Sequence, residues 1–243
     1  MAKKILFTSL KGGTGVTSCA AGIAFALAEQ GERTLLVDGD FNCGCALTVC
    51  GYDGMQVYTM SDYGRGACRA KQLLITNPKS SNLSLISCTG CKDARLTERA
   101  VFETEGLFDY VIYDGGNVKY CDFAVIVTEP YPPSVKSADR CAGAIKDLGI
   151  NDVKLIINKV SGGLIISGEI MTPEEIAALL NLKLFAVIPE DLSLPIGKIH
   201  PSTSKAFKIA ADNLCGKSDY TLNPVKRYFG VNGYIRRKMR EKL

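Results

Sequence analysis

The sequence contains no run of eighteen or more apolar residues, and its first ten residues lead into a glycine-rich turn rather than a small-residue cleavage site. We therefore expect neither a membrane-spanning helix nor a signal peptide. The composition also lacks the bias of disordered, collagen-like or low-complexity chains, because 47% of the 243 residues are hydrophobic and 22% are charged. These values are typical of a globular protein with a sizeable core.

Histidine is nearly absent, with His200 as the single example, whereas ten cysteines occur at irregular spacing. Cys88-x-x-Cys91 and Cys43-x-Cys45 are close enough to hold a metal, but one histidine and no second convincing pair disfavour a structural zinc site. A chain of this size can fold without disulfides. The cysteines therefore indicate reduced thiols and a cytoplasmic location.

The net charge of +4 is unevenly distributed along the chain. Residues 217–243 contain eight basic and two acidic side chains, so the preceding residues are slightly acidic. Apolar residues recur within this basic end at spacings of three and four, which places them on one face of a helix. We expect this amphipathic segment to bind an anionic membrane surface, and the residues predicted to do so are Tyr228, Val231, Ile235, Arg236, Arg237, Met239 and Arg240. A helix docked on its own domain, or a solubilising tail, remains the alternative.

Short apolar runs alternate with helical stretches along residues 1–210. The predicted strands are 3–9, Thr34–Val37, Leu83–Ser87, Tyr110–Tyr113, Ala124–Thr128, Lys154–Ile157 and Phe185–Ile188, and the predicted helices include Cys19–Glu29, Ser134–Leu148 and Pro173–Leu180. Because parallel strands need helical crossovers, the pattern predicts an α/β fold, a mainly parallel twisted sheet with helices on both faces. We expect one domain over 1–215, a linker over 216–224 and the basic tail over 225–243.

A glycine-rich loop follows the first predicted strand and precedes the first predicted helix. In phosphate-binding loops, glycines let backbone N–H groups face the phosphates, a lysine contacts them, and a Ser or Thr hydroxyl holds Mg²⁺. Gly12, Gly13, Gly15, Thr17 and Ser18 occupy suitable positions. Val16 stands where the lysine is expected and Leu10 stands where the first glycine is expected, so the strict P-loop pattern fails.

The stretch from Lys11 to Ser18 nevertheless resembles the deviant Walker A loop of the MinD/ParA family of ATPases, with Lys11 matching the signature lysine of that family. The resemblance continues in the four segments 37–40, 108–116, 156–160 and 187–191. It also includes the linking stretches 66–75, 134–140 and 168–172, which are closer to the MinD branch. Several motifs in the right order are much more specific than one glycine-rich loop.

The resemblance implies a P-loop NTPase fold and a role for each site residue. Lys11, Gly12, Gly13, Thr14, Gly15, Val16, Thr17 and Ser18 would bind the phosphates of ATP, and Asn158, Pro189, Glu190 and Asp191 would surround the base. Thr17 would ligate Mg²⁺, with Asp38 and Asp114 holding its waters. Asp40 would position the attacking water. Lys11 would reach across a homodimer to the partner's phosphates, which makes Lys11 and Asp40 the predicted catalytic pair.

Val16 removes one ammonium group from the phosphate site. Backbone amides, the helix dipole, Mg²⁺ and Lys11 remain, so ATP binding can persist where hydrolysis becomes slow or is lost. The switch region also differs, because Asp114-Gly115-Gly116-Asn117 replaces the usual Asp-x-Pro-Ala-Gly stretch.

The resemblance implies a MinD-like, ATP-dependent dimerising membrane switch that regulates division-site placement with a MinC-type inhibitor as partner. The protein would then be cytoplasmic and reversibly membrane-associated. One alternative is a non-hydrolysing polar scaffold for pilus assembly, which Val16 favours. Another is a ParA-like DNA-segregation ATPase whose basic tail binds DNA phosphates. The apolar stripe of the tail argues against the DNA alternative.

Overall fold

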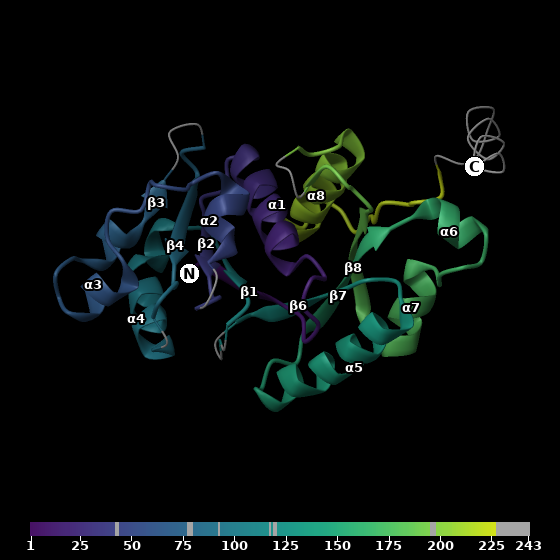
Figure 1. Ribbon diagram of the computed structural model, residues 1–243, viewed down its shortest axis with the longest axis horizontal. Coiled ribbons are helices and arrows are strands. Elements are labelled where there is room, and N and C mark those ends of the chain that lie inside the picture. Colours follow the sequence, from purple (N-terminus) through teal and green to yellow (C-terminus); the bar gives the residue numbers. More distant parts are fainter. Residues whose placement is uncertain are drawn as a thin grey trace.

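The computed structural model describes residues 1–41, 44–76, 80–91, 93–116, 118, 121–194 and 198–226. Within this part of the chain, eight strands form one sheet in the order β3-β4-β2-β5-β1-β6-β7-β8 (Figure 1). Neighbouring strands are parallel except for the antiparallel pair β3 and β4. The strands are β1 (Lys3–Thr8), β2 (Thr34–Asp38), β3 (Ile75–Thr76), β4 (Leu83–Ser87), β5 (Tyr110–Asp114), β6 (Phe123–Thr128), β7 (Val153–Val160) and β8 (Lys183–Pro189).

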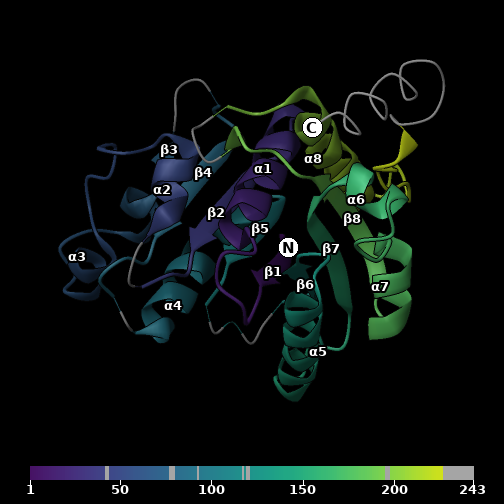
Figure 2. The same cartoon turned by 45° about the vertical axis from the view of Figure 1, so that its right-hand side comes forward.

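Helices cover both faces of this sheet (Figures 1 and 2). One face is covered by α1 (Val16–Glu29), α2 (Cys45–Cys50) and α8 (Pro201–Leu214). The other is covered by α3 (Met60–Gly64), α4 (Ala94–Thr104), α5 (Pro132–Asp147) and α7 (Pro173–Leu180). Shorter helical turns are α6 (Gly162–Ile166), η1 (Ala70–Leu73) and η2 (Glu105–Leu107). The predicted mainly parallel α/β fold is confirmed.

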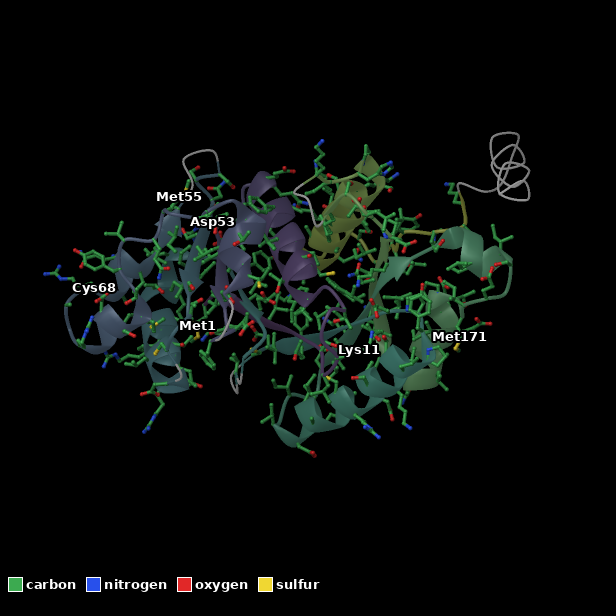
Figure 3. The ribbon with its side chains drawn as sticks, in the orientation of Figure 1. Met1, Lys11, Asp53, Met55, Cys68 and Met171 are labelled. Atoms are coloured by element: carbon green, nitrogen blue, oxygen red, sulfur yellow. The ribbon has the colours of Figure 1, made fainter. Side chains whose placement is uncertain are left out.

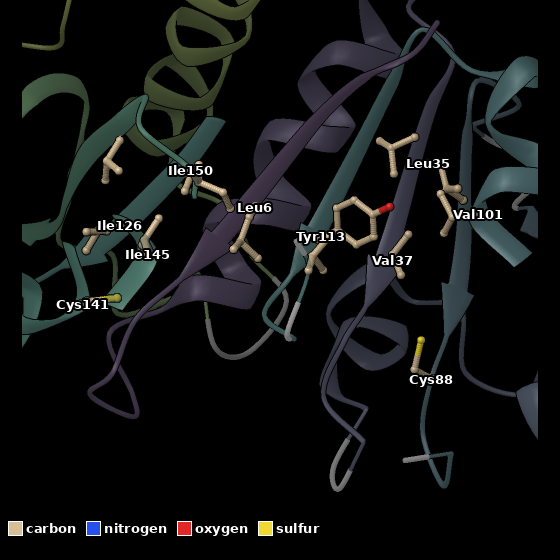
Figure 4. Packing of buried hydrophobic residues seen from close by; sticks show 14 of the residues in the cluster. Leu6, Leu35, Val37, Cys88, Val101, Tyr113, Ile126, Cys141, Ile145 and Ile150 are labelled. Atoms are coloured by element: carbon tan, nitrogen blue, oxygen red, sulfur yellow. The ribbon is translucent and has the colours of Figure 1, made fainter. Parts of the chain in front are cut away.

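Side-chain alternation along the strands divides the core into two clusters. In β1, Leu6 belongs to one cluster, whereas Ile5 and Phe7 belong to the other. Figure 4 shows Leu6 between Tyr113 of β5 and the group that contains Ile126 of β6. Because nearly every residue of the central strands is buried, each strand is apolar on both faces, as expected for a parallel sheet between two helical layers.

Several predicted boundaries move by one or more residues. The first strand ends at Thr8 rather than at residue 9, and the first helix begins at Val16 rather than Cys19, because the helical turn starts directly after Gly15. Helix α5 begins two residues earlier than predicted, since Pro132 fits the first helical turn. Helix α7 has the predicted bounds, and its predicted cap is present as a reciprocal pair of hydrogen bonds between Thr172 and Glu175.

The strand order places a crevice at the carboxyl ends of β1 and β6. From β1 the chain passes through α1, on one face of the sheet, to β2 on one side of β1. From β6 it passes through α5, on the other face, to β7 on the other side of β1. Ligands of open α/β sheets bind where strand order reverses in this way. Among the described residues, no helix combines the length and the apolar character that a membrane span requires.

Candidate functional site

The loop between β1 and α1 presents backbone donors at the crevice. Gly13 and Gly15 have φ values of 79° and 90°, which glycine adopts without steric cost. Gly15 caps α1, and no side chain in the described structure caps this helix end. The buried hydroxyl of Thr14 also has no hydrogen-bond partner among the described residues. These donors fit a phosphate group, because the N–H groups at a helix start carry partial positive charge.

Val16 is the first residue of α1, and its half-buried side chain packs against the hydrophobic cluster beneath that helix. A lysine at this position would place an ammonium group at the loop, whereas valine contributes only apolar contact. Leu10, which stands before the loop, is 59% exposed. Any positive charge at the loop therefore comes from backbone N–H groups, from Lys11 of the loop itself and from Lys159 of β7.

Asp38 and Asp114 lie side by side at the carboxyl ends of β2 and β5, where they are register partners. They were predicted just beyond two strands and are instead the last residues of those strands. Both are buried, and burial, followed in smaller measure by the charges of Asp38 and Asp40, raises the pKa of Asp114 to about 7. A hydrogen bond with Thr17 acts in the opposite direction. A cation would reduce the repulsion between these carboxylates. Asp38, Asp114 and Thr17 therefore fit Mg²⁺.

The two strand ends can approach closely because Gly39 follows Asp38. A Cβ atom at Gly39 would lie 2.7 Å from the carbonyl oxygen of Gly115. The Asp38 carboxylate accepts hydrogen bonds from the backbone N–H groups of Asp40, at 3.1 Å, and Ala46, at 3.0 Å. Asp40, two residues after Asp38, is exposed. The predicted metal and water-positioning residues are thus brought together.

Asn158 lies within β7 rather than in the loop that follows it, and its side chain is buried. Its Nδ2 donates a hydrogen bond of 2.7 Å to the carbonyl oxygen of Thr14. A Cβ atom at Gly15 would lie 2.3 Å from the same nitrogen, which explains glycine there. Asn158 therefore braces the glycine-rich loop, and its contact with a base stays a prediction.

Pro189 ends β8, and Glu190 and Asp191 follow it directly. Burial would raise the pKa of Asp191, but hydrogen bonds from Ser193 and His200 outweigh it and hold the pKa at about 2. Pro189 also lines a cavity of about 300 Å³. The other lining residues come from the end of β7, from α8 and from the segment after α8: Val160, Ser202, Lys205, Tyr220, Leu222, Asn223, Pro224 and Lys226. Glu190 is exposed and does not line it.

A cluster around Glu129 was not predicted from the sequence. Glu129 follows β6, is 7% exposed, and contacts two lysines: Lys11 Nζ lies 2.5 Å from Oε2, and Lys159 Nζ lies 2.7 Å from Oε1. Ser134 donates a further hydrogen bond of 3.0 Å to Oε2. Lys159 also donates to the carbonyl oxygen of Gly13 at 2.6 Å. Figure 3 shows Lys11 near α5, as these contacts require.

The hydrogen bonds from the two lysines and Ser134 exceed the opposing effect of burial and lower the pKa of Glu129 to about 2. Its carboxylate is therefore charged at neutral pH. The sequence contains two weak signals for this cluster: Lys159 adjoins the predicted Asn158, and Glu129 follows a predicted strand of the same sheet. Neither signal places the two side chains at the glycine-rich loop.

The family model described as the CobQ/CobB/MinD/ParA nucleotide binding domain matches residues 5–198. The chain belongs to this family. It is 30% identical to the septum site-determining protein MinD of Thermotoga maritima, over 78% of this chain and 76% of that protein. The family is defined by a nucleotide-binding domain, and its MinD and ParA members are in general ATPases. The resemblance to the MinD branch is confirmed.

Solved structures of MinD proteins have the same fold. The MinD cell division protein of Aquifex aeolicus superposes with a TM-score of 0.81 at 26% identity, covering 91% of this chain and all of that chain. The MinC:MinD cell division complex from the same organism gives a TM-score of 0.83 at 25% identity, covering 91% of this chain and 99% of that chain. This chain is therefore similar to MinD cell division proteins over most of its length.

The basic end of the chain is only partly described. All seven residues predicted to contact a membrane, from Tyr228 to Arg240, lie outside the described residues. The predicted linker lies against the domain: Asn213 Nδ2 donates to the carbonyl oxygen of Tyr220 at 2.8 Å, and Leu222 packs on the cluster beneath α1 and α8. The boundaries of linker and tail stay predictions.

Among the cysteines that the structure describes, most are buried. Burial raises the pKa of Cys19, Cys50, Cys88 and Cys121 to about 12. The described residues hold no group of three or more histidine, cysteine or acidic side chains arranged for a metal. The Asp38 and Asp114 pair with Thr17 suits a cation that brings phosphate and water ligands of its own.

Proposed function

We propose that this chain is a MinD-like, ATP-binding switch: its ATP-bound form dimerises and binds anionic membranes through residues 225–243, in the control of division-site placement. The observation that carries the proposal is the meeting of a glycine-rich loop, two buried carboxyls and Thr17 at one crevice. The family match over residues 5–198 supports it.

Each part of the site has a function in this proposal. The amides of residues 12–18 would bind the phosphates, and Thr17, Asp38 and Asp114 would hold Mg²⁺ and its waters. Magnesium bound there would neutralise phosphate charge. Asn158 and Pro189 to Asp191 would surround the base, with Asn158 also keeping the loop in shape through Thr14.

Asp40 would orient the water that attacks the terminal phosphate, because it is exposed beside the two buried carboxyls. With Val16 in place of lysine, we propose slow hydrolysis. Phosphate release by the unaltered protein and by Asp40→Ala tests this step. Equal rates would remove Asp40 from the mechanism.

A MinC-type division inhibitor is the proposed partner, since an Aquifex aeolicus protein similar to this chain was solved as a MinC:MinD complex. The second candidate is a non-hydrolysing polar scaffold, which Val16 favours. In that case, nucleotide would bind and the dimer would persist, because no hydrolysis would reset it.

Co-sedimentation with anionic liposomes tests the switch. The full chain is compared with a chain ending at Lys226, which keeps the segment docked on the domain, in Mg-ATP, in Mg-ADP and without nucleotide. Binding that needs both ATP and residues 227–243 is expected. Binding that needs the tail but ignores nucleotide would favour the scaffold, and binding without the tail would contradict the proposed membrane segment.

A further inference from the structure

Contacts of Glu129 with Lys11 and Lys159 join the loop after β1 to the loop after β6 and to β7. Lys11 comes from the first loop, and Glu129 comes from the second. Because α1 and α5 leave these loops toward opposite faces of the sheet, the ion pair spans the place where nucleotide phosphates are proposed to bind. Lys11 is thus occupied within its own subunit.

We propose that Glu129 is a positioning residue that holds Lys11 on its own subunit until the nucleotide-bound dimer forms. This inference rests on the proposed function, in which Lys11 reaches the phosphates of the partner. An ammonium that contacts Glu129 at 2.5 Å has to leave that carboxylate before it can make the contact across the dimer. Glu129 therefore opposes dimerisation.

The contact between Lys11 and Glu129 can break at low cost, because Glu129 keeps other partners when Lys11 leaves. Lys159 binds Oε1, and Ser134 binds Oε2, so the nearly buried carboxylate remains paired and hydrogen-bonded. A buried charge that lost its only partner would pay a large desolvation penalty. The 40% exposure of the Lys11 side chain also lets water take part in the exchange.

The backbone at Lys159 indicates that this second partner is specifically placed. Lys159 has φ of 55°, a left-handed conformation that is uncommon for a residue with a side chain. It lies where the pairing of β7 with β8 shifts register between Ile157 and Val160. The irregularity aims the ammonium at both Glu129 and the carbonyl oxygen of Gly13. The surrounding structure must over-determine such a conformation for it to persist.

Sedimentation velocity with Mg²⁺ and a non-hydrolysable ATP analogue tests the proposal on the full chain. For Glu129→Gln we expect release of Lys11 to favour the dimer by about tenfold per subunit, and hence by about a hundredfold in the dimer dissociation constant. The matched control is Glu105→Gln, because Glu105 contacts Lys4 at the same 2.5 Å and its side chain is 13% exposed, against 10% for Glu129. Glu105 lies in η2, away from the loop.

Lys11→Met separates positioning from a general effect of charge. If Glu129 acts through Lys11, Glu129→Gln has no further effect on dimerisation when Lys11 is already methionine. Glu129→Asp keeps the charge on a shorter side chain. It should weaken the contact with Lys11 and, like Glu129→Gln, lower the dimer dissociation constant. It also keeps the proposal testable if Glu129→Gln does not fold, as thermal melting would reveal.

Nucleotide binding by calorimetry in the same samples separates this inference from the proposed function. An unaltered chain that binds no ATP analogue overturns both. An unaltered chain that binds it, with a dimer dissociation constant unchanged in Glu129→Gln and Glu129→Asp, overturns the positioning role alone. An equal change in Glu105→Gln, or a change that persists without Lys11, also overturns it.

Discussion

Restoring a lysine at position 16 should increase affinity for phosphate groups in particular. Val16 begins α1, directly after Gly15, and its side chain is only half-buried. A longer side chain can therefore extend toward the loop without entering the core. The ammonium of Val16→Lys would add charge-assisted hydrogen bonds to the phosphates, beside the backbone amides of the helix start.

Hydrogen bonds to charged groups contribute about 1.5–3 kcal/mol, which corresponds to about a 10- to 150-fold lower dissociation constant for ATP. The lost contact of valine with the cluster beneath α1 opposes folding, by no more than about 1–2 kcal/mol for a side chain that is only half-buried. Calorimetry with ATP, ADP and adenosine measures the first effect, and thermal unfolding measures the second.

Val57→Lys is the matched control, because Val57 is 80% exposed and the substitution adds the same charge elsewhere. Affinity for ATP and ADP should rise in Val16→Lys alone, while affinity for adenosine stays constant. A comparable gain for adenosine, or an equal gain in Val57→Lys, would refute the assignment of position 16 to the phosphate site.

Three further predictions follow from burial and packing. The pKa of Asp114 is raised to about 7 in the folded state, so its contribution to stability is complete below about pH 4 and is lost as the pH rises through 7. The melting temperature of Asp114→Asn should therefore exceed that of the unaltered protein at pH 8 and not at pH 4. Gly22→Ala should destabilise by about 1–3 kcal/mol in denaturant titrations, since its Cβ would lie 2.4 Å from the Phe207 ring, whereas the exposed, uncrowded Gly143→Ala should be neutral or stabilising. Among the described cysteines, exposed Cys45 should react first with iodoacetamide in mass-spectrometric labelling, and faster labelling of the buried thiols would contradict their raised pKa values.

The sheet could be predicted because its strands are buried on both faces. Runs such as Tyr110–Tyr113 and Ala124–Thr128 are almost entirely apolar, and the structure contains a strand at each predicted run. The two-residue strand β3 and the five-residue helices α3 and α6 were not predicted, because such short elements contain too few residues for a period to emerge. Their positions depend on tertiary packing.

The candidate site, like the fold, could be predicted from the sequence only in part. The loop glycines and the carboxyl pair Asp38 and Asp114 are close in sequence to strand ends, so the rule that parallel strands share a carboxyl edge brings them together. The contact of Lys159 with the loop depends on a left-handed residue within a strand, which no hydrophobic period reveals. The pairing of Glu129 with Lys11 joins residues 118 positions apart through side-chain geometry alone.

Valine at position 16 and the contact of Glu129 with Lys11 both affect how tightly the monomer, as opposed to the dimer, binds nucleotide. If the partner's Lys11 contributes to phosphate binding, nucleotide strengthens the dimer by the same factor by which the dimer strengthens nucleotide binding. Val16 removes affinity that a monomer would otherwise have on its own, and Glu129 withholds the remaining loop lysine in that monomer. A larger share of the affinity is then available only to the dimer. Under the proposed function, the two departures together make nucleotide binding depend more steeply on protein concentration, whereas Val16→Lys should return part of that affinity to the monomer.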